Sequence, residues 1–280
     1  MITARITDVE IQQAAQKLPT APRLLIELGT LLADPRVESD DVVTLLRQDP
    51  ALVAQLIRMA NSAAYAPVEP VGSLERAIIA VGFSEVHRLV GAVANSQLSD
   101  QTMRLYPIDG AKLRQNSLFV AVLMEELAKW AGESPGRCYT VGLLRTIGIM
   151  GLSRLELPDS GIPIFSESGE TALDVWEEKH WGVSNVEVAE KILLHWRFPH
   201  ETVKAIRWHY HPGNRHNPII HLLKLAASAS ADRFSCIPGE EGYWDIEPDN
   251  FTKAGLTHLE FQMACKKAHL KFERLRAASA

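Results

Sequence analysis

The spacing of apolar residues constrains this chain more than any other feature, because it is helical along nearly the whole sequence. Between Leu24 and Leu32, the leucines fall at the i, i+1, i+4, i+7 and i+8 positions of one helical face. Between Val120 and Ala131, the same spacing continues for more than three turns. We find no alternating apolar and polar run long enough for a useful strand, and no internal repeat. The chain is therefore predicted to be all-α.

Turn and capping residues divide these helices into groups. Thr7–Glu10 and Thr257–Glu260 each match a capping box, in which side-chain oxygens bond the free N–H groups at the start of a helix. The turn at Tyr106–Gly110 is the best boundary between two helical halves. The predicted organisation is a first helical subdomain at residues 1–105, a second at residues 106–235, and residues 236–280 with an irregular segment at 237–255 and a C-terminal helix.

Composition and charge disfavour several classes of function. The net charge of −5 argues against generic binding to nucleic acid or to an anionic membrane surface. Cys138, Cys236 and Cys265 are odd in number and widely spaced, which indicates a reducing compartment rather than a disulfide framework or a structural zinc site. The sequence has no 18-residue apolar stretch and no apolar core for a signal peptide. We therefore expect a cytoplasmic protein without a membrane partner.

The segment Gly142–Gly148 reads Gly-Leu-Leu-Arg-Thr-Ile-Gly and resembles the Gly-Leu-Leu-His-Asp-Ile-Gly signature of HD-domain metal phosphohydrolases. The resemblance places Arg145 and Thr146 where those enzymes carry a metal-binding His-Asp doublet. A guanidinium has no lone pair to give, and its charge about 4 Å from a divalent cation would cost roughly 8 kcal/mol at an effective dielectric near 20. The position is therefore predicted to repel a metal. The alternative is an ordinary apolar helix with Arg145 at its solvated edge.

A second motif, Gln48–Ser62, closely resembles the Gln-Asp-Pro-x-Leu…Leu-x-x-x-Asn-Ser block of the HDOD family, the HD-related output domain. Weaker matches in the same order extend this resemblance over roughly residues 15 to 215. The resemblance implies two packed helical subdomains, of which the second is HD-domain-like, and a regulatory module of bacterial signalling that usually lacks hydrolase activity. The family-motif residues are Gln48, Asp49, Pro50, Asn61 and Ser62. Helix capping explains Asp49 equally well, and bonds at a helix end explain Asn61 and Ser62.

The related hydrolase scaffold allows the metal-ligand positions to be compared one by one. Asn116 and Asn185 stand where active relatives carry histidine, and His209 alone is clearly retained. A single imidazole does not make a divalent metal site, so the resemblance implies no catalytic residue, metal or cofactor. The candidate residues of this degenerate metal pocket are Asn116, Arg145, Thr146, Asn185 and His209. They could bind an anion such as phosphate or a nucleotide, or Arg145 could form an ion pair that replaces the charge of the metal.

The leading hypothesis is a non-catalytic signalling protein that binds a protein partner, with a small anionic ligand able to shift that contact. The alternative is a divergent metal-dependent phosphohydrolase that acts on nucleotides or phosphodiesters through the histidines of His209–His221. Direct nucleic-acid binding is a third class, which the acidic balance of the chain disfavours. The prediction is therefore a protein partner and no nucleic acid.

Overall fold

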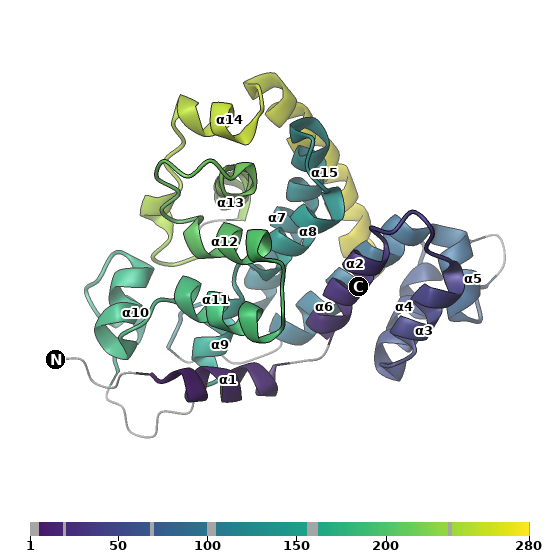
Figure 1. The fold of residues 1–280 in the computed structure, drawn as a ribbon, viewed down its shortest axis with the longest axis horizontal. Helices are drawn as coiled ribbons and strands as arrows, with labels where there is room; N and C mark the ends of the chain where they lie inside the picture. Colours follow the sequence, from purple (N-terminus) through teal and green to yellow (C-terminus); the bar gives the residue numbers. More distant parts are fainter. Residues whose placement is uncertain are drawn as a thin grey trace.

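The computed structural model describes residues 6–18, 21–67, 70–99, 105–155, 162–234 and 237–279. Within these ranges every regular element is a helix, which confirms the all-α prediction (Figure 1). The first helices are α1 (Asp8–Lys17), α2 (Ala21–Leu31), α3 (Ser39–Leu46), α4 (Pro50–Ala60), α5 (Leu74–Val81) and α6 (Phe83–Ser99). The middle helices are α7 (Gly110–Ala131), α8 (Pro135–Leu144), α9 (Ile147–Ser153), α10 (Leu173–Trp181), α11 (Asn185–His195), α12 (His200–Trp208) and α13 (Pro218–Phe234). The last are α14 (Pro248–Ala254) and α15 (His258–Ser279), and short 3₁₀ helices lie at Phe165–Glu167 and Glu241–Tyr243.

Helix α1 begins at the predicted capping box. The Thr7 side chain accepts a hydrogen bond from the Glu10 backbone N–H, and the Glu10 carboxylate accepts one from the Thr7 backbone N–H. The helix packs against α9 and α11 rather than beside α2 to α6 (Figure 1). The division between residues 105 and 106 stays a prediction, but α1 contacts the half of the chain that follows it.

Helix α7 forms the centre of the core. Its side chains from Asn116 to Ala128 are all buried, and the helix contacts α6, α8, α13 and α15. A helix that is buried on every side needs apolar residues on every face, and most of this stretch is apolar. Because α7 is surrounded in this way, any polar side chain that it carries inward, such as Asn116, needs a partner from a neighbouring helix.

Two glycines of the Gly142–Gly148 motif allow backbones to meet closely. A Cβ atom on Gly142 would lie 2.8 Å from the Cα atom of Ala121 on α7. A Cβ atom on Gly148 would lie 1.8 Å from the carbonyl oxygen of Asn185 at the start of α11. The glycines therefore hold the α8–α9 junction, which carries Arg145 and Thr146, between α7 and α11.

The C-terminal region contains more regular structure than the sequence indicated. The segment 237–255, predicted to be irregular, includes α14. Glu247 and Asn250 form a capping box at the start of this helix, which begins at Pro248. Its seven residues are too few to show an apolar period in the sequence. Helix α15 packs along α7 and also contacts α4 and α6 (Figure 1). It therefore joins the first and second halves of the chain.

No single helix among the described residues has both the length and the apolar composition to cross a membrane. One pair, Leu74–Val81 with Phe83–Ser96, passes that test jointly but is bent by 116° at the break.

Candidate functional site

The structure buries all the side chains predicted for the degenerate metal pocket. Asn116 is on α7, Arg145 and Thr146 lie between α8 and α9, Asn185 opens α11, and His209 follows α12. The most exposed of them, Asn116, retains only 4% of its accessible surface. The alternative with Arg145 at a solvated helix edge does not describe this side chain, which is 1% exposed.

Arg145 forms an ion pair with Glu240 inside the protein. Its Nη1 atom donates to Glu240 Oε1 at 3.0 Å and to Oε2 at 3.2 Å, and both side chains are 1% exposed. Its Nη2 atom donates to Asn116 Oδ1 at 2.6 Å. The hydroxyl of Tyr210 donates to Glu240 Oε1 at 2.6 Å, and the ring of Trp244 lies 5.6 Å from the guanidinium carbon. The charge that the sequence places in the metal position is therefore neutralised by a carboxylate from the C-terminal region. We call Asn116, Arg145, Tyr210 and Glu240 the buried centre.

Asn185 belongs to a second buried hydrogen-bond group that touches the first. Its backbone N–H and side-chain amide donate to Glu177 Oε2 at 2.6 and 2.8 Å, and the Tyr106 hydroxyl donates to Glu177 Oε1 at 2.8 Å. The Tyr210 hydroxyl lies 3.5 Å from Asn185 Oδ1, which links the two groups. Burial raises the pKa of Glu177 to about 8, against the opposing effect of these hydrogen bonds, so this carboxyl is mostly neutral at pH 7.

Thr146 and His209 lie beside the buried centre without joining its ion pair. Thr146 Oγ1 is 3.2 Å from Ser117 Oγ on α7. His209 Nδ1 is 2.7 Å from the Ile206 carbonyl oxygen, and its ring centre lies 4.3 Å from that of Tyr210. Burial, with a further contribution from the Arg145 charge, lowers the pKa of His209 to about 3, so the ring is neutral. Within the described part of the chain, its Nε2 atom has no hydrogen-bond partner.

Two further histidines of the His209–His221 segment, His211 and His221, bind separate protein groups. His211 Nε2 is 2.8 Å from Asp174 Oδ2, and His221 Nε2 donates to the Arg215 carbonyl at 2.9 Å. Across the described part of the chain, no group of three or more His, Cys, Asp or Glu side chains is arranged to hold a metal ion. The residues at the buried centre do not fit a divalent cation either, because they place a guanidinium where lone-pair donors are needed.

The family-motif residues lie elsewhere, around α4. The Asp49 carboxylate accepts the Leu52 N–H at 3.0 Å and caps α4, which begins at Pro50, while Gln48 is exposed. After α4, Asn61 forms two hydrogen bonds with the backbone of Val71. Its Oδ1 atom accepts the Val71 N–H at 2.7 Å, and its Nδ2 atom donates to the Val71 carbonyl oxygen at 2.8 Å. Ser62 is half-buried and follows it. Asn61 therefore holds the end of α4 against the next loop, and none of the bonds found for the motif residues joins the buried centre.

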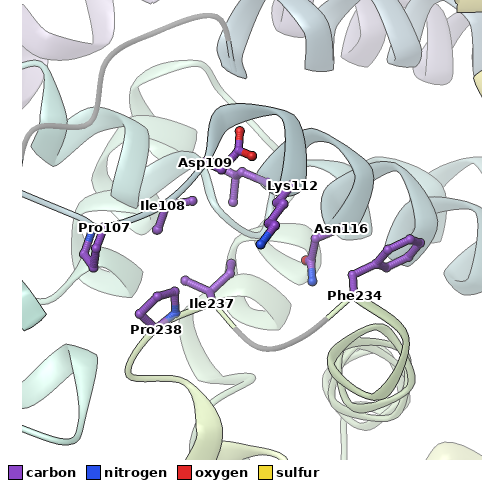
Figure 2. A pocket seen from close by; sticks show the side chains of 9 residues that line it. Pro107, Ile108, Asp109, Lys112, Asn116, Phe234, Ile237 and Pro238 are labelled. Carbon is purple, nitrogen blue, oxygen red and sulfur yellow. The ribbon is translucent and has the colours of Figure 1, made fainter.

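The buried centre borders a pocket at Asn116. This pocket has a volume of about 160 Å³, and Asn116 is the residue of the buried centre that lines it. Figure 2 shows Lys112 and Asn116 directed toward its interior, with Ile237 and Pro238 opposite. Neither Arg145 nor Glu240 lines this pocket, so it does not open directly onto the ion pair.

Glu240, Tyr210, Glu177 and Tyr106 complete these groups but were not predicted from the sequence. Glu240 is separated from Arg145 by 95 positions, and no local pattern joins the two. Glu177 did leave a signal, because it falls four residues after Leu173 and four before Trp181, on a face that is otherwise apolar. A carboxylate on such a face indicates a buried partner.

This chain matches one protein-family model, one curated relative and several solved structures. The HDOD domain model matches residues 18–212. A curated relative from Treponema pallidum (strain Nichols), described as an uncharacterized protein, is 24% identical over 238 residues, which are 78% of this chain and 45% of the relative. This chain therefore spans about half the length of that relative.

Three solved structures share the fold. An HDOD domain protein with unknown function from Geobacter sulfurreducens has a TM-score of 0.73 at 21% identity, over 96% of this chain and 97% of that one. A proposed signal transduction protein from Marinobacter aquaeolei VT8 has a TM-score of 0.72 at 21% identity, and the match covers 97% of this chain and 64% of that protein. A proposed phosphohydrolase from Shewanella amazonensis SB2B has a TM-score of 0.67 at 23% identity, and the match covers 97% of this chain and 98% of that protein. At these identities the likeness is one of fold.

Proposed function

The chain belongs to the HDOD domain family, and from this premise we propose that it is a non-catalytic signalling or regulatory protein that acts through a protein partner. The Marinobacter protein that shares the fold is described as a proposed signal transduction protein, which agrees with this proposal. The Shewanella protein described as a proposed phosphohydrolase represents the competing function. The side chains of this chain favour the first of the two.

The observation that carries the proposal is the ion pair between Arg145 and Glu240. A metal hydrolase needs an accessible centre of imidazoles and carboxylates that binds cations and activates a water molecule. Here a guanidinium fills that position, a buried carboxylate neutralises it at 3.0 Å, and Asn116 bonds its other end. This arrangement supplies structural stability but no nucleophile and no Lewis acid.

The same ion pair disfavours an anionic ligand at this position. An external phosphate would have to replace Glu240 on the guanidinium and leave the Glu240 carboxylate buried without its cation. Removing the partner of a buried charge is strongly unfavourable. We therefore assign the buried centre a structural role and the regulatory role to contacts made elsewhere on the protein.

Metal content and turnover test the proposal together. The purified chain is incubated with Mn²⁺, Fe²⁺ or Zn²⁺, freed of excess metal, and measured by mass spectrometry for bound metal. It is then assayed for hydrolysis of nucleotides, cyclic dinucleotides and a chromogenic phosphodiester. We expect much less than one metal ion per chain and no turnover above that of a heat-inactivated sample.

A matched pair of variants identifies the contrary result. His209→Gln removes the retained imidazole, and His195→Gln makes the same change at an exposed position at the end of α11. Stoichiometric metal, with turnover that His209→Gln abolishes and His195→Gln preserves, would establish the divergent phosphohydrolase instead.

A further inference from the structure

A cavity between α2, α8 and α12 differs from the buried centre in being open and largely apolar. Its volume is about 390 Å³, within the range typical of small-molecule sites. Ile26 and Ala33 line it from α2 and the turn that follows, and Phe198 and Pro199 line it from the start of α12. We call this space the interhelical cavity. Helix α2 belongs to the first half of the chain and contacts α8 of the second half, and α8 also contacts α12.

A buried histidine without a full set of partners lies behind one wall of the cavity. His87 on α6 is 5% exposed, and its Nε2 atom has no hydrogen-bond partner. A Cβ atom on Gly29 would lie 3.3 Å from this Nε2, and one on Gly136 would lie 3.8 Å from the adjacent ring carbon Cε1. Both glycines line the cavity, whereas His87 does not, so the backbone of these two glycines lies between this edge of the ring and the cavity.

The protonation of His87 determines what that edge can do. Burial lowers its pKa to about 4, against smaller opposing effects of Glu125 and of a hydrogen bond to the Leu25 backbone. The neutral ring therefore carries one proton, which the Leu25 bond holds on Nδ1. Nε2 is left as a buried acceptor without a partner among the described residues, directly behind the Gly29 wall of the cavity.

The opposite wall favours negative charge. Helix α12 begins at the cavity with Pro199 as its N-cap residue and no side-chain capping bond, so its first N–H groups are free to bond an anion. Arg137 lines the same wall, is exposed, and has no ion-pair partner within the ranges that the structure describes. Glu201 also lies here, but its carboxylate accepts hydrogen bonds from Asn217 at 2.8 Å and Lys204 at 3.5 Å.

We infer that the interhelical cavity binds a small molecule with a planar ring and one carboxylate or phosphate group. The ring would lie between Ile26 and Phe198, with a ring N–H or amino group directed at His87 Nε2. The anionic group would lie at the start of α12 beside Arg137. The inference stands apart from the proposed function, because the cavity shares no lining residue with the buried centre.

Two anions and their uncharged counterparts test this chemistry on the full chain. Indole-3-acetate and adenosine 5′-monophosphate are titrated by calorimetry and by ¹H–¹⁵N NMR, next to indole-3-acetamide and adenosine. We expect at least one anion to bind about tenfold more tightly than its uncharged counterpart, a ratio that corresponds to one charge-assisted contact. Binding of the indole anion alone would indicate an aryl carboxylate as the ligand, and binding of the nucleotide alone would indicate a nucleoside phosphate. The ¹⁵Nε2 resonance of His87 should shift when the ligand binds.

Paired variants locate the site. Thr30→Trp fills the mouth of the cavity from an exposed position on α2, whereas Glu27→Trp adds the same side chain to the same helix outside the cavity. Only the first should abolish binding. Arg137→Gln should weaken the anion about tenfold, and Lys266→Gln, which removes one exposed charge from α15, should leave its affinity unchanged. Absence of binding by both anions, equal binding of charged and uncharged molecules, or equal binding by the two tryptophan variants would each overturn the inference.

Discussion

The buried centre and the interhelical cavity differ in whether their buried polar groups have hydrogen-bond partners. In the buried centre, the Arg145 charge is paired with Glu240 and bonded to Asn116, so the protein supplies its own ligand. At the cavity, His87 Nε2 has no partner and only glycines separate it from open space. Two buried polar groups of one fold therefore differ in whether the protein itself provides their partners, and only the second leaves an acceptor unsatisfied.

The contrast is not complete, because two atoms near the buried centre also lack partners. They are Arg145 Nε and His209 Nε2. Neither residue lines the described pocket beside Asn116 or the interhelical cavity. His87 does not line either space, but Gly29 and Gly136 lie against its ring and line the interhelical cavity. An unsatisfied atom therefore indicates a ligand site only where a cavity lies next to the residues that cover it.

Breaking the ion pair should have the largest effect. Glu240→Gln leaves the buried guanidinium without its counter-charge, and we expect the free energy of unfolding to fall by about 3–5 kcal/mol. Urea denaturation followed by circular dichroism measures the loss. Glu75→Gln removes one partner of the exposed Arg47–Glu75 pair and should cost about 1 kcal/mol or less. Equal losses in the two variants would show that Arg145 does not depend on Glu240.

The second prediction concerns pH and Glu177. The carboxyl loses its proton near pH 8 in the folded state but near its ordinary value of 4.5 in the unfolded state. Between these values unfolding releases a proton, so this group lowers stability as pH rises, by on the order of 4–5 kcal/mol across the range. Glu177→Gln keeps the shape and removes the proton, and its stability should not decline in this way. Denaturation curves from pH 5 to 8 test this, with exposed Glu27→Gln as the control. A wild-type slope that persists in Glu177→Gln would contradict the assignment.

The third prediction compares the stability lost when a glycine is replaced by alanine, at Gly148 beside the buried centre and at Gly29 beside the interhelical cavity. The expected effects are smaller than those above. Gly148→Ala would bring a methyl group to 1.8 Å from the Asn185 carbonyl oxygen, so backbone must move, and we expect a loss of about 2–3 kcal/mol. Gly29→Ala meets only the edge of the His87 ring at 3.3 Å, and the better helix propensity of alanine offsets that contact to within about 1 kcal/mol. Thermal unfolding of the two variants compares them. A larger loss for Gly29→Ala would mean that the cavity wall is as tightly packed as the α9–α11 contact.

The fold was largely predictable because its main determinants are local. Apolar spacing predicted the helices, the Thr7 capping box is formed, and the HDOD resemblance agrees with the family model over residues 18–212. Helix α14 was missed because seven residues beginning at a proline show no apolar period. Local patterns also gave no indication that α1 would pack on α9 and α11.

The partners at the buried centre were less predictable because they come from distant parts of the chain. The resemblance to HD hydrolases implied that Arg145 stands at a metal-ligand position, but its counter-charge lies 95 positions away in a segment predicted to be irregular. The interhelical cavity is harder still to predict. It depends on the absence of side chains at Gly29 and Gly136, on two helices that meet only in the folded protein.

Anomalous diffraction from crystals soaked in Mn²⁺ measures the central claim most directly. We predict that Arg145 remains bonded to Glu240 and Asn116, with no manganese peak near His209. A manganese ion coordinated by His209, with Arg145 displaced from Glu240, would contradict the account.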